Sequence, residues 1–270
     1  MPDIQSLSLA ELEALLRFHH DAGADEVLTD TPVNRFAQSA PQAKPTQKRE
    51  TPSPAPVPSQ PAKPAVIPDQ NVVADATTIA RQAKNLDELR ASIEAFDGCN
   101  LKNTARNLAF EGGNRAADIM IVAGAPSRDD DTSGMALSGA DGVLLTNMFN
   151  AIGVDLKQDT YQGLCVPWAP PGGGPPTPLH LRTMRPFIER QIELKTPSVL
   201  VVLGNVAAQH LLDPKQTILK LRGQWFDFRA GDLATKAFAM HEPAYLRQHA
   251  SAKRTTWHDL LALKKQLTAR

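Results

Sequence analysis

Hydrophobic residues recur with two spacings along the second half of the chain, and together they predict alternating strands and helices. Short, largely apolar runs are typical of strands that are buried on both faces of a sheet. Four such runs occur, at residues 118–123, 161–166, 198–203 and 238–241. The segments after the first three runs, at 140–152, 179–194 and 207–212, place apolar residues at the helical period.

This alternation also predicts how the elements are arranged. Strands that alternate with helices form parallel sheets through right-handed crossovers. We therefore expect an α/β fold, a three-layer α/β/α sandwich with a central parallel sheet, which further helices at 76–95 and 251–267 complete. In open parallel sheets the ligand site lies beyond the carboxyl ends of the strands. The loops at 124–139, 167–178 and 241–247 are therefore the candidate site.

The first part of the chain has a different pattern. Ser8 and Glu11 have the spacing of a capping box and begin an amphipathic helix that we expect over residues 9–21. Prolines then recur from residue 37 to residue 69 with few large apolar side chains, which predicts a disordered linker. We thus expect an N-terminal helix and tail (1–34), a Pro/Ala-rich linker (35–75) and the α/β domain (76–270). The helix either docks onto a protein partner or folds back on the domain, and the sequence leaves both open.

Charge and cysteine content narrow the class of protein. The formal net charge is +0, so a nucleic acid would have to be met by a local basic patch. The two cysteines, Cys99 and Cys165, do not make a secreted disulfide scaffold. The N-terminus lacks the order of a signal peptide, and no run approaches the roughly 18 apolar residues of a membrane span. We expect a soluble, cytoplasmic monomer that does not enter a membrane.

Several stretches of the domain carry a family resemblance. They read EGGNRAADIMIVAGAP, APPGGGPPTP, MRPFIERQIELKTPSVLVVLG and PAYLRQ, and they follow one another along residues 97–267. In this order they resemble family four of the uracil-DNA glycosylase superfamily, the iron-sulfur type. The resemblance implies the glycosylase-like α/β fold and DNA as the partner.

The same resemblance implies a base pocket, but the chain departs from the family at each polar position. The family's first loop reads Gly-Glu-Ala-Pro-Gly, whereas residues 123–127 place Gly124 at the glutamate, followed by Ala125 and Pro126. Leu137 stands where an aromatic residue stacks on the uracil, and a leucine cannot supply that stacking. Leu164 stands where an asparagine reads the base. Glu242 precedes Pro243 where a histidine stabilises the departing anion, and a carboxylate would repel that charge.

The positions that would hold the iron-sulfur cluster have changed as well. By the resemblance they are Phe96, Cys99, Trp168 and Met184, so Cys99 is the one remaining cluster-type cysteine. A cluster held by cysteine needs about four thiolates. We therefore expect no cofactor and no metal, and we expect the large apolar side chains to fill the vacated space.

Three residues are candidates to replace the missing catalytic groups. Asp130, within the acidic run 129–131, either serves as a general base or belongs to a solvated loop. His241 takes over from the family histidine if the turn has slipped by one residue, and otherwise it simply ends a strand. Glu242 is the third candidate, because it stands where the resemblance implies the family histidine. Four basic residues either contact DNA phosphates, as their place in the family implies, or are ordinary surface charges: Arg128, Arg247, Lys253 and Arg254.

Two functions follow from these observations. The first is a uracil-DNA glycosylase-like protein of the base-excision repair type that binds DNA weakly or without catalysis, because its catalytic site is degraded. The alternative is an active DNA glycosylase that hydrolyses the N-glycosidic bond of uracil or another damaged base with a rearranged site. Losing several groups that act on one transition state removes orders of magnitude in rate, which favours the first.

Overall fold

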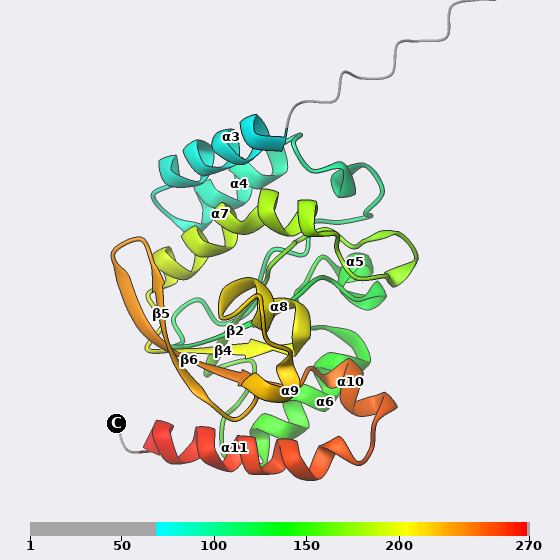
Figure 1. The fold of residues 1–270 in the computed structure, drawn as a ribbon, viewed down its shortest axis with the longest axis vertical. Coiled ribbons are helices and arrows are strands. Elements are labelled where there is room, and N and C mark those ends of the chain that lie inside the picture. Colours follow the sequence, from blue (N-terminus) through cyan, green and yellow to red (C-terminus); the bar gives the residue numbers. More distant parts are fainter. Residues whose placement is uncertain (1–68, 269–270) are drawn as a thin grey trace, which may run out of the picture. The chain divides into compact units, whose positions relative to one another are not determined.

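A six-stranded sheet organises residues 69–268, the part of the chain that the computed structural model describes (Figure 1). The strands lie in the order β1-β3-β2-β4-β6-β5. Their bounds are β1 Gly112–Gly113, β2 Ile119–Ala123, β3 Thr160–Leu164, β4 Val199–Leu203, β5 Trp225–Ala230 and β6 Leu233–Met240. The four central strands are parallel, with Ile121 opposite both Gln162 and Val201. This confirms the expected α/β fold with a central parallel sheet.

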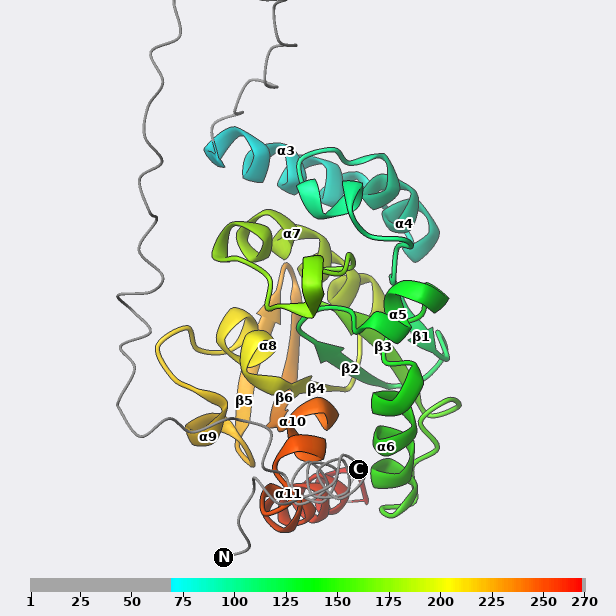
Figure 2. The same cartoon turned by 90° about the vertical axis from the view of Figure 1, so that its right-hand side faces the viewer.

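Helices connect the strands and cover both faces of the sheet. The main helices are α3 Asp69–Gln82, α4 Leu86–Ala95, α5 Arg128–Ser133, α6 Gly139–Asn150, α7 Pro178–Lys195, α8 Gly204–Leu211, α9 Ile218–Leu221, α10 Pro243–Gln248 and α11 Ala252–Thr268. Short 3₁₀ turns occupy Asn100–Asn103 and Pro171–Gly173. Helices α6 and α11 lie on one side of the sheet and α7 on the other, with α3 and α4 beyond α7 (Figure 2).

The buried side chains form three clusters that match these layers. One face of the sheet packs Ile121 and its neighbours against Leu145 and Phe149 of α6 and Leu260 of α11. The other face packs residues such as Met120 against α7 and α8. A third cluster lies where α3 and α4 cover α7. The alternate side chains of each central strand therefore serve two different cores, which is why these strands are apolar throughout.

The structure corrects several of the expected helices. The single helix expected at 76–95 is two helices, because Asn85 caps a new helix and accepts a hydrogen bond from the Glu88 backbone N–H at 2.8 Å. Helix α3 begins at Asp69, so residues 69–75 are helical rather than part of the extended linker. The loop at 124–139 contains α5, and the turn after β6 continues into α10.

The edges of the sheet also differ from the expectation. Strands β1 and β5 were not predicted, and both pair antiparallel with their neighbours. Strand β6 begins at Leu233, several residues before the expected run, because it forms a hairpin with β5. Along most of β5 and the first half of β6, more exposed positions alternate with less exposed ones. The continuous buried run is therefore confined to the end of β6.

Some expectations fall on residues that are not described. The N-terminal helix expected at 9–21 and most of the proline-rich segment lie outside residues 69–268. Within those residues, no helix combines the length and the apolar character that crossing a membrane requires.

Candidate functional site

A cavity of about 400 Å³ opens at the carboxyl ends of the parallel strands, and we call it the strand-end cavity. It is lined by the end of β2 and the loop to α5, by the first turns of α6, α8 and α10, and by residues 173–176 of the proline-rich loop. All three candidate loops therefore contribute to it. The predicted pocket residues that line it are Gly124, Ala125, Pro126, Leu137 and Glu242.

Two predicted residues lie elsewhere. Leu164 is 3% exposed and belongs to the same buried cluster as Leu137, but it does not line the cavity. His241 is 2% exposed, and its ring stacks on that of Tyr245 with 4.7 Å between centroids. Burial lowers the pKa of His241, and nearby Arg222 lowers it further. The turn thus points Glu242, and not His241, into the cavity.

The packing beside Gly124 leaves no room for a larger residue at this position. A Cβ at this position would lie 2.7 Å from the Cβ of Val206, closer than real Cβ atoms approach. Val206, in the first turn of α8, therefore occupies the space that a side chain at position 124 would need. The cavity has no room for a water-activating acid on this wall without a shift of α8.

Leu137 lies on the opposite side in an uncommon backbone conformation. Its φ of 55° is left-handed, and Thr196 is the other non-glycine residue with a positive φ among residues 69–268. The Leu137 carbonyl lies against the first turn of α6, where a Cβ at Gly142 would meet its oxygen. Non-glycine residues in this region cost on the order of 1 kcal/mol and concentrate at functional sites.

Asp130 is buried and serves the loop itself. Its Oδ2 accepts a hydrogen bond from the Ser127 backbone N–H at 2.8 Å, as part of the capping box of α5. Its Oδ1 accepts two more from Ser138, from the backbone N–H at 2.5 Å and from the hydroxyl at 2.8 Å. The carboxylate thus ties the start of α5 to the start of α6, which positions Leu137 between them.

Two further carboxyl groups line the cavity. Burial raises the pKa of Glu242 above its ordinary value, and the charge of Asp141 raises it further. Burial also raises the pKa of Asp141, an effect that Arg247 opposes from 3.0 Å away. The Glu242 carboxyl group lies across Gly204, where a Cβ would come within 2.4 Å of its Oε2. Among residues 69–268 it has no ion pair and no side-chain hydrogen bond.

The four predicted phosphate-binding residues are all exposed. Arg128 lines the rim of the cavity, and Arg247 pairs with Asp141. Lys253 and Arg254 lie in the first turn of α11, where Lys253 borders an apolar hollow beside Trp257. Among residues 69–268, Arg128, Lys253 and Arg254 form no ion pair, whereas Arg247 pairs with Asp141 in the cavity wall.

The positions that the resemblance assigns to an iron-sulfur cluster come together in one apolar core. Phe96, Cys99, Trp168 and Met184 are all at most 6% exposed and share the cluster beneath α3 and α4. The ring of Phe96 lies 5.1 Å from that of Phe187. Burial raises the pKa of the Cys99 thiol, which favours its neutral form. One neutral thiol among aromatic side chains does not fit an iron-sulfur cluster.

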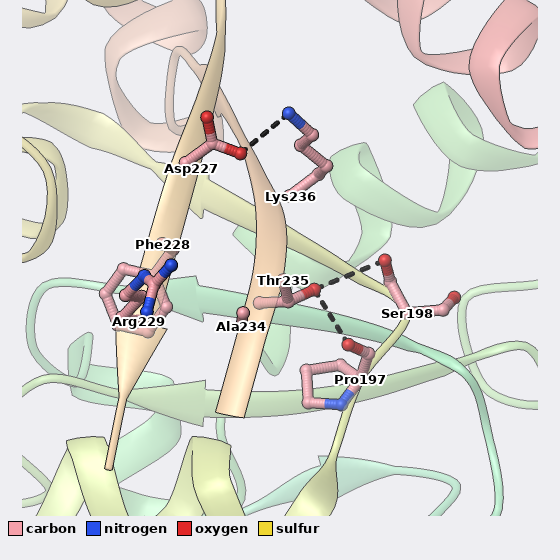
Figure 3. A pocket seen from close by; sticks show the side chains of 8 residues that line it. All are labelled: Pro197, Ser198, Asp227, Phe228, Arg229, Ala234, Thr235 and Lys236. Carbon is pink, nitrogen blue, oxygen red and sulfur yellow. Dashed lines mark hydrogen bonds and ion pairs between the residues drawn. The ribbon is translucent and has the colours of Figure 1, made fainter. Parts of the chain in front are cut away.

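A second hollow, of about 480 Å³, lies at the amino ends of the strands (Figure 3). Its polar groups satisfy one another. Lys236 pairs with Asp227 at 2.7 Å, and the Thr235 hydroxyl donates to the Pro197 carbonyl at 2.8 Å. The strand-end cavity differs because its Glu242 carboxyl group has no such partner within the described residues. In the described part of the chain, no group of three or more His, Cys, Asp or Glu side chains is placed to hold a metal ion.

The sequence alone missed two residues of this site. Asp141 follows Gly139 in the first turn of α6, and Val206 follows Gly204 in the first turn of α8. In open α/β sheets, ligands bind near the first turns of the helices that follow the strands. The position of both residues directly after a predicted strand or loop was therefore a usable signal. Their orientation toward the cavity depends on tertiary packing.

The parallel sheet and the cavity built by its three strand-end loops define an open α/β domain with a ligand cavity at the carboxyl ends of its strands. The chain belongs to the uracil DNA glycosylase superfamily, whose family model matches residues 110–261, more than half of the chain. It is 33% identical to a Type-4 uracil-DNA glycosylase of Archaeoglobus fulgidus over 60% of this chain and 82% of that protein. It is 30% identical to one of Thermotoga maritima over 59% of this chain and 81% of that protein. For one of Saccharolobus solfataricus the identity is 24%, over 69% and 88%.

Proposed function

We propose that this member of the superfamily has a degraded catalytic site. We propose that it binds DNA at the edge of its sheet where the parallel strands end. The observation that carries the proposal is the composition of the cavity. It is large enough for a ligand, yet it presents Gly124, Leu137 and Glu242 where uracil excision needs an acid, an aromatic ring and an anion stabiliser. Relatives that share the fold are named uracil-DNA glycosylases, which supports DNA as the partner.

The geometry also weakens the two substitute catalysts. A general base must lie within hydrogen-bond reach of its water. Asp130 already accepts hydrogen bonds from Ser127 and Ser138 on both oxygens. His241 is buried against Tyr245 and does not line the cavity. Neither residue is placed to replace the family's catalytic groups.

An active glycosylase with a rearranged site is the second candidate. One observation favours it: Glu242 lines the cavity, lacks a hydrogen-bond partner among residues 69–268 and has a raised pKa. Carboxyl groups with raised pKa values in a cavity are typical of general acids and bases. Release of a base from DNA, lost in Glu242→Gln, would support this candidate over the first.

Binding of labelled single-stranded DNA, followed by fluorescence anisotropy over a range of salt concentrations, tests the proposal. We expect the double variant Lys253→Ala, Arg254→Ala to bind more weakly, because each lost phosphate contact removes a released counterion. The slope of log affinity against log salt should fall by roughly 0.7 per contact. The matched control is Lys264→Ala, Lys265→Ala near the far end of α11, which removes the same charge. Equal affinity of the two double variants, or no binding by the unaltered chain, would contradict the proposal.

A further inference from the structure

The charges that line the strand-end cavity are mostly negative. Its lining contains the carboxyl groups of Asp130, Asp141 and Glu242 and a single cationic side chain, the exposed Arg128 at the rim. Asp130 is held by Ser127 and Ser138, and Asp141 is partly compensated by Arg247. Glu242 therefore remains as a carboxyl group without a cation or a hydrogen-bond donor in the described part of the chain.

The surroundings of Glu242, within the described residues, supply no counter-charge for its carboxyl group. The nearest charge that acts on it is the second carboxyl group, that of Asp141. Its side chain lies over Gly204, at the N-terminal turn of α8, whose N-cap Leu203 supplies no side-chain hydrogen bond. The N-terminus of α8 places a partial positive charge near this carboxyl group, which is less than the full charge of a cationic side chain. A partly buried carboxylate of this kind favours a cationic ligand, because pairing compensates for its loss of solvation.

The remaining walls suit a flat, partly apolar ligand. Leu137, Pro126 and Val206 contribute aliphatic side chains to the cavity lining, together with the small residues Gly124 and Ala125. Aliphatic surface accepts an alkyl group but offers no ring to stack on an uncharged base. The cavity therefore combines apolar contact with negative charge.

These features distinguish two classes of nucleobase. When a neutral uracil leaves DNA, the electron pair of the C1′–N bond makes the base an anion, and Glu242 would oppose that charge. A base alkylated on a ring nitrogen that bears no proton in the parent base, such as N3 of cytosine, already carries a positive charge. A carboxylate would attract it in the intact nucleotide, and no anionic base would have to be held at any stage.

We infer that the strand-end cavity binds a cationic nucleobase, of the class formed by alkylation of a ring nitrogen, in preference to uracil. The inference rests on the proposed function, because the base must reach the cavity as part of a DNA strand. Glu242 supplies the charge that selects the cation, with Asp141 as its neighbour. Leu137, Pro126 and Val206 supply the contact for the alkyl group.

Competition binding with the full chain and single-stranded oligonucleotides of one sequence tests this inference. One oligonucleotide carries 3-methylcytosine, which is cationic at neutral pH, and the matched one carries 5-methylcytosine, which has its methyl group on a ring carbon and is neutral. A third carries uracil at the same position. We expect affinity for the cationic base to exceed that for either neutral base by about tenfold or more, as expected for a partly buried ion pair.

Variants show whether Glu242 is the source of the preference. Glu242→Gln keeps the size of the side chain and should reduce the preference for the cationic base over 5-methylcytosine to about twofold or less. Asp75→Asn, an exposed acid on α3, is the control and should keep the full preference.

Two results would overturn the inference while DNA binding itself persists: equal affinity for the two methylated strands, or a preference that survives in Glu242→Gln. The comparison of the two strands in the unaltered chain is decisive even if the variant does not fold. Failure of the proposed function has a different signature, because then none of the oligonucleotides would bind.

Discussion

Two regions of the domain hold the positions that the resemblance assigns to an iron-sulfur cluster and to a base pocket, and the two regions are packed differently. At the four cluster positions, the large side chains of Phe96, Trp168 and Met184 pack with Phe187 in a buried core. At the carboxyl ends of the strands, a cavity of about 400 Å³ stays open, with Glu242 facing it. One region has been filled and the other has not.

The difference has a physical meaning. Protein interiors are close-packed because an empty space costs stability, so a vacated cluster site is best filled with apolar side chains. An open cavity lined by carboxyl groups gives no such gain, and a carboxylate without a partner is costly. The filled region therefore contributes stability, and the open region is where we expect a ligand.

The largest effect is expected in the filled region. Trp168→Ala removes a side chain that is 4% exposed and should lower the free energy of unfolding by about 3 to 5 kcal/mol. Leu219→Ala, at a residue that is 65% exposed, is the control and should change it by less than about 0.5 kcal/mol. Chemical denaturation measures both. A small effect of Trp168→Ala would mean that this core is loose and that the contrast between the regions does not hold.

Asp130 tests whether the acid in the loop is structural. Asp130→Ala leaves the Ser127 and Ser138 donors without their acceptor and should destabilise the domain by about 2 to 3 kcal/mol. The exposed Asp75→Ala should have almost no effect on unfolding. If instead Asp130→Ala kept the stability and removed a base-releasing activity, Asp130 would be the catalyst that the hydrogen bonds argue against.

The wall at Gly124 is tested by filling it. Gly124→Ala places a Cβ against Val206 and should cost about 1 to 3 kcal/mol of stability, because the interior is overpacked. Val206→Ala removes the atoms that clash, so the double variant should be more stable than the sum of the two single effects predicts. Strict additivity of the two substitutions would show that Val206 does not occupy this space.

Glu242 has the smallest expected effect on stability, and the size of this effect depends on pH. Because burial and Asp141 raise its pKa, the folded state holds this proton more tightly than the unfolded state does. The ionised group therefore costs stability once the pH exceeds the ordinary pKa of glutamate, about 4.3. Glu242→Gln should raise the Tm at neutral pH, and the difference should vanish in acid below that value. A lower Tm at neutral pH would show that the carboxylate has a stabilising partner.

Much of the fold follows from residue patterns. The buried runs of β2 and β4 and the periodic helices α6, α7 and α11 lie within a few residues of their predicted places. The edge strands β1 and β5 could not be found in this way, because a two-residue strand and a half-exposed strand have too short an apolar pattern. The break between α3 and α4 did have a signal, the capping pair Asn85 and Glu88.

The site was less predictable than the fold. The sequence identified the three loops, and the structure brings Gly124, Leu137 and Glu242 together in one cavity. The sequence could not show that Asp130 accepts hydrogen bonds from Ser138, or that Val206 fills the space beside Gly124. These are contacts between loops, set by the packing of α5, α6 and α8, and local patterns do not specify them.

Uracil excision under single-turnover conditions tests the central claim most directly. Protein in excess is incubated with a labelled, uracil-containing oligonucleotide, and alkali then cleaves any abasic site before the strands are separated on a denaturing gel. We expect no cleaved product above the protein-free control, because the cavity presents Gly124, Leu137 and Glu242 at the positions where the family resemblance implies the groups that excise uracil. Product that forms with the unaltered chain and disappears in Glu242→Gln or His241→Ala would contradict the account.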